Sequence, residues 1–462
     1  MEIGFETIGN ATLIVHDQRP VLVTDPWIQG SAYFGSWKLS HEVPEPQFKA
    51  ACDAEYVWFS HGHPDHLNSE SLPLFSKQKI LLPDHVGRRI EKDLRGQGFK
   101  VMVMPSRTWL PLSPRVRVMC IPDFNQDAIL LVDVNGRLVV NLNDAGDRGW
   151  GNLVRKLVKT YRVSYLLALY GHGDADMINF FDESGTRVPR PPKTPLGEQI
   201  SRDAEVLGTR FFIPFSSLHR YQRTDSAWAA PRAATPDDYA DGWDSKACEL
   251  LPAFLRVDCA KDSFERIDPK PTADTLYPPE HFGDDWSQRL EPGDLKKLED
   301  YFGAIERLRD GIDFVGFKVG GKSHTLWLRS RGRLRKGLTL EAPRNSLMAA
   351  VENEVFDDLL IGNFTKVTLH GRWPATQPLY PDFTPFVAKY ADNGRAKTQV
   401  ELDAYFAEYR RRDQLGYARA IFQNEVLRPV QEASKNVLRT AVGPRSSMYK
   451  LAKRTYWSLR SR

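Results

Sequence analysis

Four residues of types that bind divalent metals lie close together in one segment of the sequence. His61, His63, Asp65 and His66 form a His-x-His-x-Asp-His pattern directly after the apolar run at 56–59. Imidazole and carboxylate groups suit borderline-soft ions such as zinc, and they also suit iron. A strand that ends here would fix the backbone while the loop turns several ligands inward. The spacing therefore predicts a site for one or two zinc ions, or for iron.

We expect the four residues to have different roles. His61 and His63 hold the first metal, while Asp65 and His66, the predicted catalytic pair, face a second metal or the water that it activates. Water bound to a divalent ion loses a proton near neutral pH and becomes a hydroxide nucleophile. The same loop could equally present iron to dioxygen. Hydrolysis and oxygen chemistry are both open at this point.

The elements that must position these residues are those of a layered α/β sandwich. The dipeptide Asn135-Gly136 is typical of a two-residue hairpin between two strands. Runs rich in β-branched residues predict strands, and longer segments with helical periodicity predict helices. We expect strands near 12–15, 21–24, 56–60, 100–104, 115–121, 128–134, 137–142, 163–170 and 210–214, and helices near 69–77, 84–96, 150–161 and 196–207.

Chain length and proline-rich segments divide the sequence further. A chain of 462 residues exceeds the size at which one core stops growing. In the second half we expect strands near 312–319, 323–329 and 364–370 and a helix near 344–360. The predicted organisation is a metal-binding domain at 1–265, a proline-rich linker at 266–289, a small α+β module at 290–395 and a helical, basic C-terminal tail at 396–462.

Composition and charge limit the class of protein. Apolar residues make up 41% of the chain, charged residues make up 26%, and no apolar run is long enough to span a bilayer. The N-terminus lacks the pattern of a signal peptide, and the four cysteines are scattered, so we expect a cytoplasmic protein with reduced thiols. The net charge is +4. Outside the tail there is no strongly basic stretch, and no nucleic-acid partner is expected.

The tail itself is a basic arm, because no acidic residue follows Glu432. Its lysines, arginines and aromatic residues favour a solvated basic helix or a disordered end, with peripheral contact with an anionic membrane surface as the alternative.

The metal motif and two further acidic residues resemble the metallo-β-lactamase superfamily over roughly residues 1–225. Asp25 ends an early β-rich run, where the superfamily places an acidic residue that braces the metal loop. Asp144 follows the run at 139–143, where the superfamily places its metal-bridging aspartate. The resemblance implies the four-layer αβ/βα sandwich of that superfamily, an α/β fold, with Asp144 as a further metal ligand.

Two histidines that the superfamily normally supplies lack a direct counterpart. The stretch at 120–127 contains none, so Asp123 is the candidate oxygen ligand in its place. The run at 212–215 also ends without one, and His172 and His219 are the candidates to replace it.

Two arginines follow His219 closely in the sequence. Arg220 and Arg223 could bind a phosphate or carboxylate group of an anionic substrate. Solvated loop charge is the more common role of such residues, so both interpretations stay open.

Four segments resemble one group within the superfamily more narrowly, the CMP-N-acetylneuraminate hydroxylases. These segments are 59–68, 141–144, 213–216 and 356–364. That family hydroxylates a sugar nucleotide and receives electrons through a Rieske [2Fe-2S] domain, which needs Cys-x-His and Cys-x-x-His pairs. No histidine lies two or three residues beyond any cysteine of this chain. A hydroxylase of this sequence would therefore depend on a separate electron-transfer protein.

The sequence thus favours a metal-dependent hydrolase of this superfamily, in which a metal-bound hydroxide attacks an ester, amide or phosphoester of a small anionic, sugar-nucleotide-like substrate. The first alternative is a non-haem iron hydroxylase of a sugar nucleotide with a separate Rieske or ferredoxin electron donor. The second is a degenerate metal-binding scaffold. The intact ligand cluster argues against a scaffold, because unused buried polar groups are costly.

Overall fold

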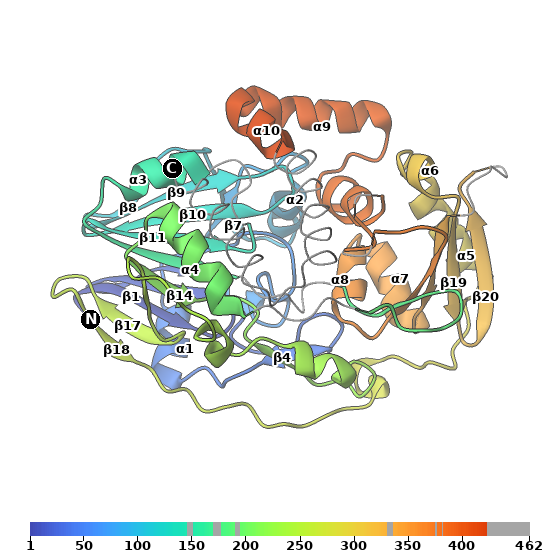
Figure 1. Cartoon of the computed structure of the whole chain (residues 1–462), viewed down its shortest axis with the longest axis horizontal. Helices are drawn as coiled ribbons and strands as arrows, with labels where there is room; N and C mark the ends of the chain where they lie inside the picture. The colour runs from blue at the N-terminus through green and yellow to red at the C-terminus, as the bar shows by residue number, and fades with distance from the viewer. Residues whose placement is uncertain are drawn as a thin grey trace, which may run out of the picture.

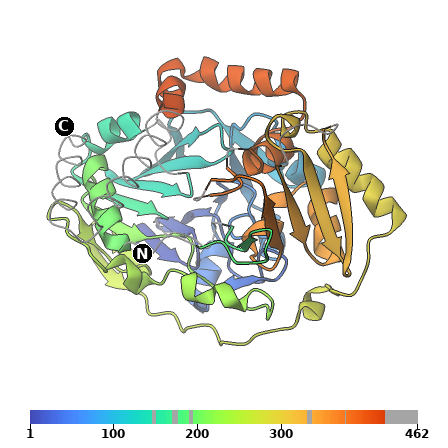
Figure 2. The ribbon, with the colours of Figure 1, turned by 45° about the vertical axis from the view of Figure 1, so that its right-hand side comes forward.

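The structure is a computed structural model, and it describes residues 1–145, 151–169, 177–189, 195–329, 336–374, 377–380 and 382–422. A large first domain lies on one side and a smaller second module on the other (Figure 1). A long extended segment runs along the lower edge and joins the two (Figure 2).

The first sheet of the large domain begins at the N-terminus. Its strands from β3 onward are parallel, so their carboxyl ends meet at one edge. Among the described residues its order is β18 (Ser263–Arg266), β17 (Leu255–Asp258), β1 (Ile3–Ile8), β2 (Thr12–Asp17), β3 (Arg19–Thr24), β5 (Tyr56–Trp58), β6 (Lys79–Pro83) and β7 (Lys100–Met104).

The second sheet contains the predicted hairpin. Asn135 and Gly136 both have positive φ, at 51° and 76°, as the two-residue turn between β10 and β11 requires. Among the described residues its order is β16 (Glu249–Leu250), β14 (Phe211–Pro214), β12 (Val163–Ala168), β11 (Arg137–Asn143), β10 (Ala128–Val134), β9 (Val116–Pro122) and β8 (Leu110–Ser113).

The two sheets pack face to face, with helices on their outer faces. Phe5 and Leu13 of the first sheet share one apolar core with Leu130 and Val139 of the second. The first sheet is covered by α1 (Glu45–Cys52) and α2 (Arg89–Gly96), and the second by α3 (Gly151–Val158) and α4 (Leu196–Leu207). The predicted four-layer αβ/βα sandwich is confirmed.

The second module has a sheet and a core of its own. Its helices α5 (Pro292–Gly303), α6 (Leu308–Gly311), α7 (Arg344–Glu352) and α8 (Phe356–Ile361) pack on the sheet. One edge strand, β13, comes from the first half of the chain and pairs with β22. In the described residues the sheet order is β13 (Phe180–Phe181), β22 (Lys366–His370), β21 (Gly337–Glu341), β19 (Phe314–Val319) and β20 (Lys322–Trp327).

Shorter elements complete the described part of the chain. The strands β4 (Trp37–Leu39) and β15 (His219–Tyr221) pair with each other. Single helical turns are η1 (Leu72–Phe75), η2 (Ala227–Arg232), η3 (Pro236–Tyr239) and η4 (Pro279–Phe282), and η5 (Pro385–Asn393) is a π-helix. The helices α9 (Gln399–Arg412) and α10 (Gln414–Ile421) lie across the top of the molecule (Figure 1).

Several predicted elements differ from the observed ones. The segment at 69–77 holds only the short turn η1, and the helix expected from residue 84 begins at Arg89. The apolar run at 79–83 forms the missed strand β6, because it is buried between parallel neighbours. The helix expected at 344–360 is two helices, and the chain reverses between them where Glu354 adopts a φ of 52°.

The C-terminal residues 423–462, with most of the basic tail, lie outside the described residues. Every helix in the described part of the chain is too short or too polar to span a lipid bilayer.

Candidate metal centre

The His-x-His-x-Asp-His loop lies where several strands of the first domain end. β5 leads directly into the loop, the adjacent parallel strand β3 ends one residue before Asp25, and β11 of the other sheet ends one residue before Asp144. Residues that follow the carboxyl ends of parallel strands gather at one edge of a sheet, where α/β proteins build their sites. The topology therefore brings these side chains together.

His61 and His63 direct ring nitrogens toward the same place. The Nε2 atom of His61 lies 2.9 Å from Nδ1 of His63 and 3.9 Å from Oδ2 of Asp144. These three residues offer ligand atoms that all lie within 4.8 Å of one another. Burial and the neighbouring histidines hold the pKa of His61 well below its usual value, so its ring is neutral, as a metal ligand must be.

His66 forms a second convergence beside the first. Its Nε2 atom lies 3.6 Å from Oδ2 of Asp65 and 3.4 Å from Oδ2 of Asp144. The side chain is fully buried, and this nitrogen has no hydrogen-bond partner among the described residues. Two largely buried carboxylates beside this nitrogen need a positive charge, and a metal ion bound there would supply it. The donor set thus fits a metal ion.

Asp144 lies between the two groups, in the place of a bridging carboxylate. Burial alone would raise its pKa, but His66 and a hydrogen bond from Ser216 outweigh burial and lower the pKa to about 2. Asp144 is therefore ionised at neutral pH and available to a cation.

Buried side chains of the first domain hold the ligands in place. Asp25 accepts a hydrogen bond of 2.7 Å from the backbone N–H of Ser60 and lies 3.1 Å from Nδ1 of His66. A carboxylate in this position orients the ring of a metal-binding histidine. Asp65 accepts hydrogen bonds from the hydroxyl of Tyr33 at 2.5 Å and from Nδ2 of Asn10 at 3.0 Å.

Two carboxylates of the second module lie beside His63. Asp357 and Asp358 lie in the first turn of α8. This helix lies on the side of the second module that faces the first domain (Figure 1). The Oδ2 atom of Asp357 lies 3.0 Å from Nε2 of His63, and both aspartates form a possible ligand group with this histidine. Segment 356–364 resembles the hydroxylases in sequence, but its residue pattern did not predict a contact with the metal loop. A residue 294 positions from His63 gives no local signal of such a contact.

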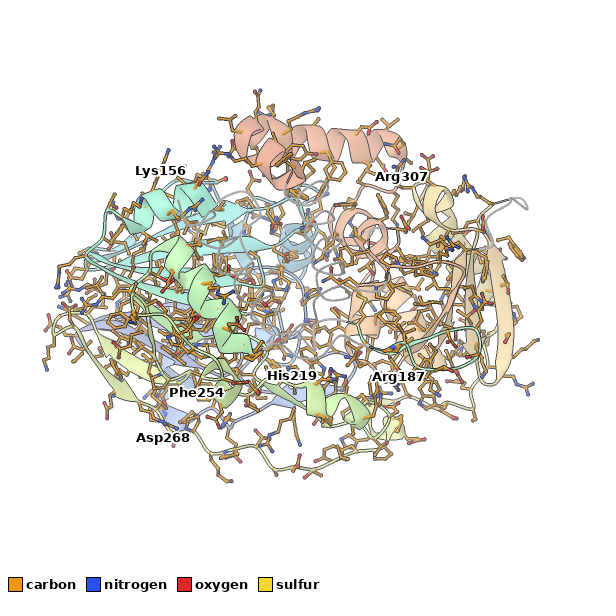
Figure 3. All side chains as sticks on the ribbon, viewed as in Figure 1. Lys156, Arg187, His219, Phe254, Asp268 and Arg307 are labelled. Atoms are coloured by element: carbon orange, nitrogen blue, oxygen red, sulfur yellow. The ribbon has the colours of Figure 1, made fainter. Side chains whose placement is uncertain are left out.

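The structure does not bring Asp123 or His219 into either ligand group of the described residues. Asp123 accepts hydrogen bonds from the backbone N–H groups of Asn125 and Asp127, as in a turn. His219 stacks on Trp37 with ring centroids 3.4 Å apart, and burial lowers its pKa to about 3. It lies at the lower part of the first domain (Figure 3). His172 falls outside the described residues.

The two predicted substrate-binding arginines have different surroundings. Arg223 is fully buried and forms ion pairs with Asp225 at 2.8 Å and Asp284 at 2.7 Å. This places it in the interior, where it joins the linker to the first domain rather than facing a substrate. Arg220 is partly exposed and donates to the carbonyl oxygen of Thr272 at 3.1 Å.

The side chains of the proposed ligands differ in their exposure to solvent. The side chains of Asp65 and His66 are almost fully buried, whereas those of His63 and Asp144 are 14% and 16% exposed. His63 and Asp144 are thus the more accessible of these ligands.

No family model matches the chain. Over 165 residues the chain is 28% identical to the cytidine monophosphate-N-acetylneuraminic acid hydroxylase of Cricetulus griseus. The aligned region covers 34% of this chain and 29% of the hydroxylase. The chain thus matches less than a third of the length of this curated relative.

Solved structures show more distant similarity. CmlA, a diiron β-hydroxylase from Streptomyces venezuelae, has 13% identity and a TM-score of 0.36, with 58% of this chain and 54% of CmlA covered. The metallo-β-lactamase fold protein YhfI from Bacillus subtilis has 10% identity and a TM-score of 0.32, with 54% and 90% covered. Over about a third of its length the chain resembles the CMP-N-acetylneuraminate hydroxylases, as its motifs predicted.

Proposed function

We propose that this chain is a non-haem iron enzyme that hydroxylates a small anionic molecule. The observation that carries the proposal is the convergence of His61 Nε2, His63 Nδ1 and Asp144 Oδ2 in one ligand group. Two histidines and one carboxylate are typical of iron sites that activate dioxygen, because the remaining coordination positions stay open. When bound, iron would supply this oxygen chemistry.

The sequence relatives suggest a substrate class. The curated relative is named for hydroxylation of cytidine monophosphate-N-acetylneuraminic acid, a sugar nucleotide. This relative matches only 34% of this chain, so its substrate is a starting point. We therefore propose to test a sugar nucleotide first. Cytoplasmic location would agree with such a substrate.

Hydroxylation sets a requirement for a partner. One oxygen atom of dioxygen enters the new C–O–H group and the other leaves as water, which consumes two electrons and two protons. No Rieske cysteine–histidine pair is present in the sequence. We therefore propose that a separate electron-transfer protein, of the Rieske or ferredoxin class, supplies the electrons.

The residues of the chain itself prepare the site for this chemistry. The neutral ring of His61 and the ionised carboxylate of Asp144 are both in the state that binds a metal. Asp25 orients the ring of His66, and the hydroxyl of Tyr33 donates a hydrogen bond to Asp65. Burial of the loop keeps bulk water away from the metal ligands.

Hydrolysis is the second candidate, and a separate observation favours it. Asp65, His66 and Asp144 converge beside the first group, and two adjacent metal sites with a shared carboxylate suit zinc-dependent hydrolysis of an ester, amide or phosphoester. The metal that the protein selects would separate the two candidates.

Elemental analysis of the full chain, purified without added metal, tests the proposal. We expect iron near one or two equivalents, lost in the double variant His61→Ala/His63→Ala and retained in His281→Ala, which removes an exposed histidine. Oxygen uptake with CMP-N-acetylneuraminate and a reduced ferredoxin would then measure hydroxylation. Zinc with oxygen-independent turnover of a phosphoester would replace this proposal by hydrolysis, and a metal-free protein would leave the scaffold interpretation.

A further inference from the structure

A cavity of the first domain lies apart from the metal centre. Its volume of about 860 Å³ is in the range of sites that bind small molecules. His219, Phe254 and Asp268 line it, and all three lie in the lower part of the first domain (Figure 3). The residues of the two metal-ligand groups are not among those that line it. The proposed function therefore leaves this cavity unused.

One segment of the chain, residues 214–221, contacts both the metal centre and the cavity. On the side of the centre, the hydroxyl of Ser216 donates to Asp144 at 2.8 Å. A few positions further on, residues 219–221 line the cavity. A ligand in the cavity would thus contact a segment that supports the metal centre, and not the metal ligands themselves.

Arg220 brings hydrogen-bond donors to the cavity. Its side chain is 36% exposed, and its one hydrogen bond among the described residues runs from Nη1 to the carbonyl oxygen of Thr272 at 3.1 Å. A guanidinium group has five N–H donors, so most of them remain available. Its ion-pair partner Asp274 lies 3.8 Å away and is 86% exposed, so solvent weakens that pair. Arg220 can therefore bind a carboxylate or phosphate group of a ligand.

Two further basic side chains lie close to Arg220. Burial and the positive charge of Arg220 lower the pKa of His41, which also lines the cavity. Burial and Arg220 lower the pKa of Lys38 as well, against the opposite effect of Asp274. Positive groups that repel one another are stabilised by an anion between them.

Three acidic residues also line the cavity, and each is paired or exposed to solvent. Asp268 forms an ion pair with Arg266 on the same segment, Asp274 is mostly exposed, and Asp237 is exposed. Ion pairing and water reduce their effect on a ligand. Arg220 is therefore the charged group that determines the class of ligand.

The rest of the wall is largely apolar and rigid. Leu251 and Phe254 are buried side chains of this wall. Proline has a fixed φ, so a wall rich in proline loses little freedom when a ligand binds. The prolines that line the cavity are Pro214, Pro236, Pro252, Pro269 and Pro271. An apolar wall with a few charged groups is typical of sites for small organic molecules.

We propose that this cavity is a second binding site, which takes a small organic anion. Arg220 would bind the carboxylate or phosphate group of the ligand, and its apolar body would pack on Phe254 and the prolines. This site goes beyond the function proposed above and does not depend on a metal ion.

NMR titration of the full-length protein tests this inference, because it also measures weak binding. The probes are benzoate, phenyl phosphate and the neutral benzamide, which share a benzene ring and differ in the attached group. The variants are Arg220→Ala and Arg220→Lys. The matched control is Arg162→Ala, which removes an exposed arginine of the same domain that does not line the cavity. Thermal unfolding checks that each variant is folded.

We expect at least one of the two anions to bind about 10-fold or more tightly than benzamide, because only an anion forms a charge-assisted pair with Arg220. The tighter anion identifies the group that the site takes. Arg220→Ala should weaken that anion about 10-fold or more and leave benzamide unchanged, and Arg220→Lys should retain part of the difference. Arg162→Ala should match the unaltered protein.

Titration of the double variant His61→Ala/His63→Ala separates the cavity from the metal centre, since a phosphate or carboxylate can also bind a metal ion. We expect the tighter anion to bind this variant with unchanged affinity. Loss of binding there would place the anion at the metal centre and overturn the inference. Anion binding that is unchanged in Arg220→Ala, or no binding of either anion, would also overturn it. None of these outcomes bears on whether the protein holds iron or zinc.

Discussion

The Nε2 atom of His63 lies 3.0 Å from Oδ2 of Asp357, although 294 positions separate the two residues in the chain. One residue belongs to the metal loop of the first domain and the other to α8 of the second module. The side chain of Asp357 is almost fully buried. The placement of one module on the other thus decides the surroundings of a predicted metal ligand.

The contacts of Arg89 with the turn between α7 and α8 should affect metal affinity from a distance. Arg89→Ala removes hydrogen bonds from a charged donor to two carbonyl oxygens, which we expect to cost about 2 to 3 kcal/mol of unfolding free energy. Zinc affinity should fall as well, because α8 loses an anchor. Urea unfolding and zinc titration measure both effects. Arg95→Ala, which removes an exposed partner of Glu91, should cost less than about 1 kcal/mol and leave zinc binding unchanged.

The two arginines after His219 should differ in what they support. Arg223→Ala leaves the carboxylates of Asp225 and Asp284 without their buried partner, so we expect a loss of about 3 to 5 kcal/mol in unfolding free energy. Arg220→Ala removes a partly exposed side chain and should cost about 1 kcal/mol or less. Chemical denaturation of both variants makes the comparison. Equal, small losses would contradict a structural role for Arg223.

Glu6 should give the protein a stability that is lost in acid. Burial would raise the pKa of this carboxyl, but hydrogen bonds from His16, Gln47 and Arg256 outweigh burial and lower the pKa from 4.5 to about 2. Because the folded pKa is the lower one, the contribution is fully present above about pH 4.5 and is lost as the pH falls toward 2. A shift of this size corresponds to about 3 kcal/mol.

The variant Glu6→Gln measures this contribution. Its unfolding free energy should lie about 3 kcal/mol below that of the unaltered protein at pH 7, and the difference should fall to half or less by pH 3. The control is Glu265→Gln, at an exposed position, which should show no such pH dependence. A difference for Glu6→Gln that stays constant from pH 7 to pH 3 would contradict the expectation.

Gly87 should tolerate no side chain, because the first domain approaches the C-terminal part of the chain there. Its φ is 88°, and a Cβ atom would lie 2.5 Å from the carbonyl oxygen of Gly394. Gly98 has a similar φ of 89° but no atom within 4 Å of such a Cβ. Gly98→Ala should therefore cost only the strain of a left-handed alanine, about 1 kcal/mol. Gly87→Ala should cost clearly more, as thermal unfolding would show.

Local signals in the sequence predicted much of the first domain. The turn at Asn135 and Gly136 and the helix at 196–207 agree with the structure, because each depends on neighbouring residues. The strand β6 was missed, since a short apolar run resembles a loop or helix segment until parallel neighbours bury it. The helix expected at 344–360 is interrupted at Glu354, whose φ is positive. Neither glycine nor proline marks this interruption in the sequence.

The sequence by itself determined the ligand loop. His61, His63 and His66 follow a strand within a few residues, so the geometry of a short backbone segment is enough to bring them together. Only the tertiary structure decided which other side chains meet them. Asp357 contacts His63 because the two modules pack together. Arg223 is buried in an ion pair with Asp284, which lies 61 positions away in the chain. Such contacts arise from packing between segments far apart in the chain, which no local pattern of residues encodes.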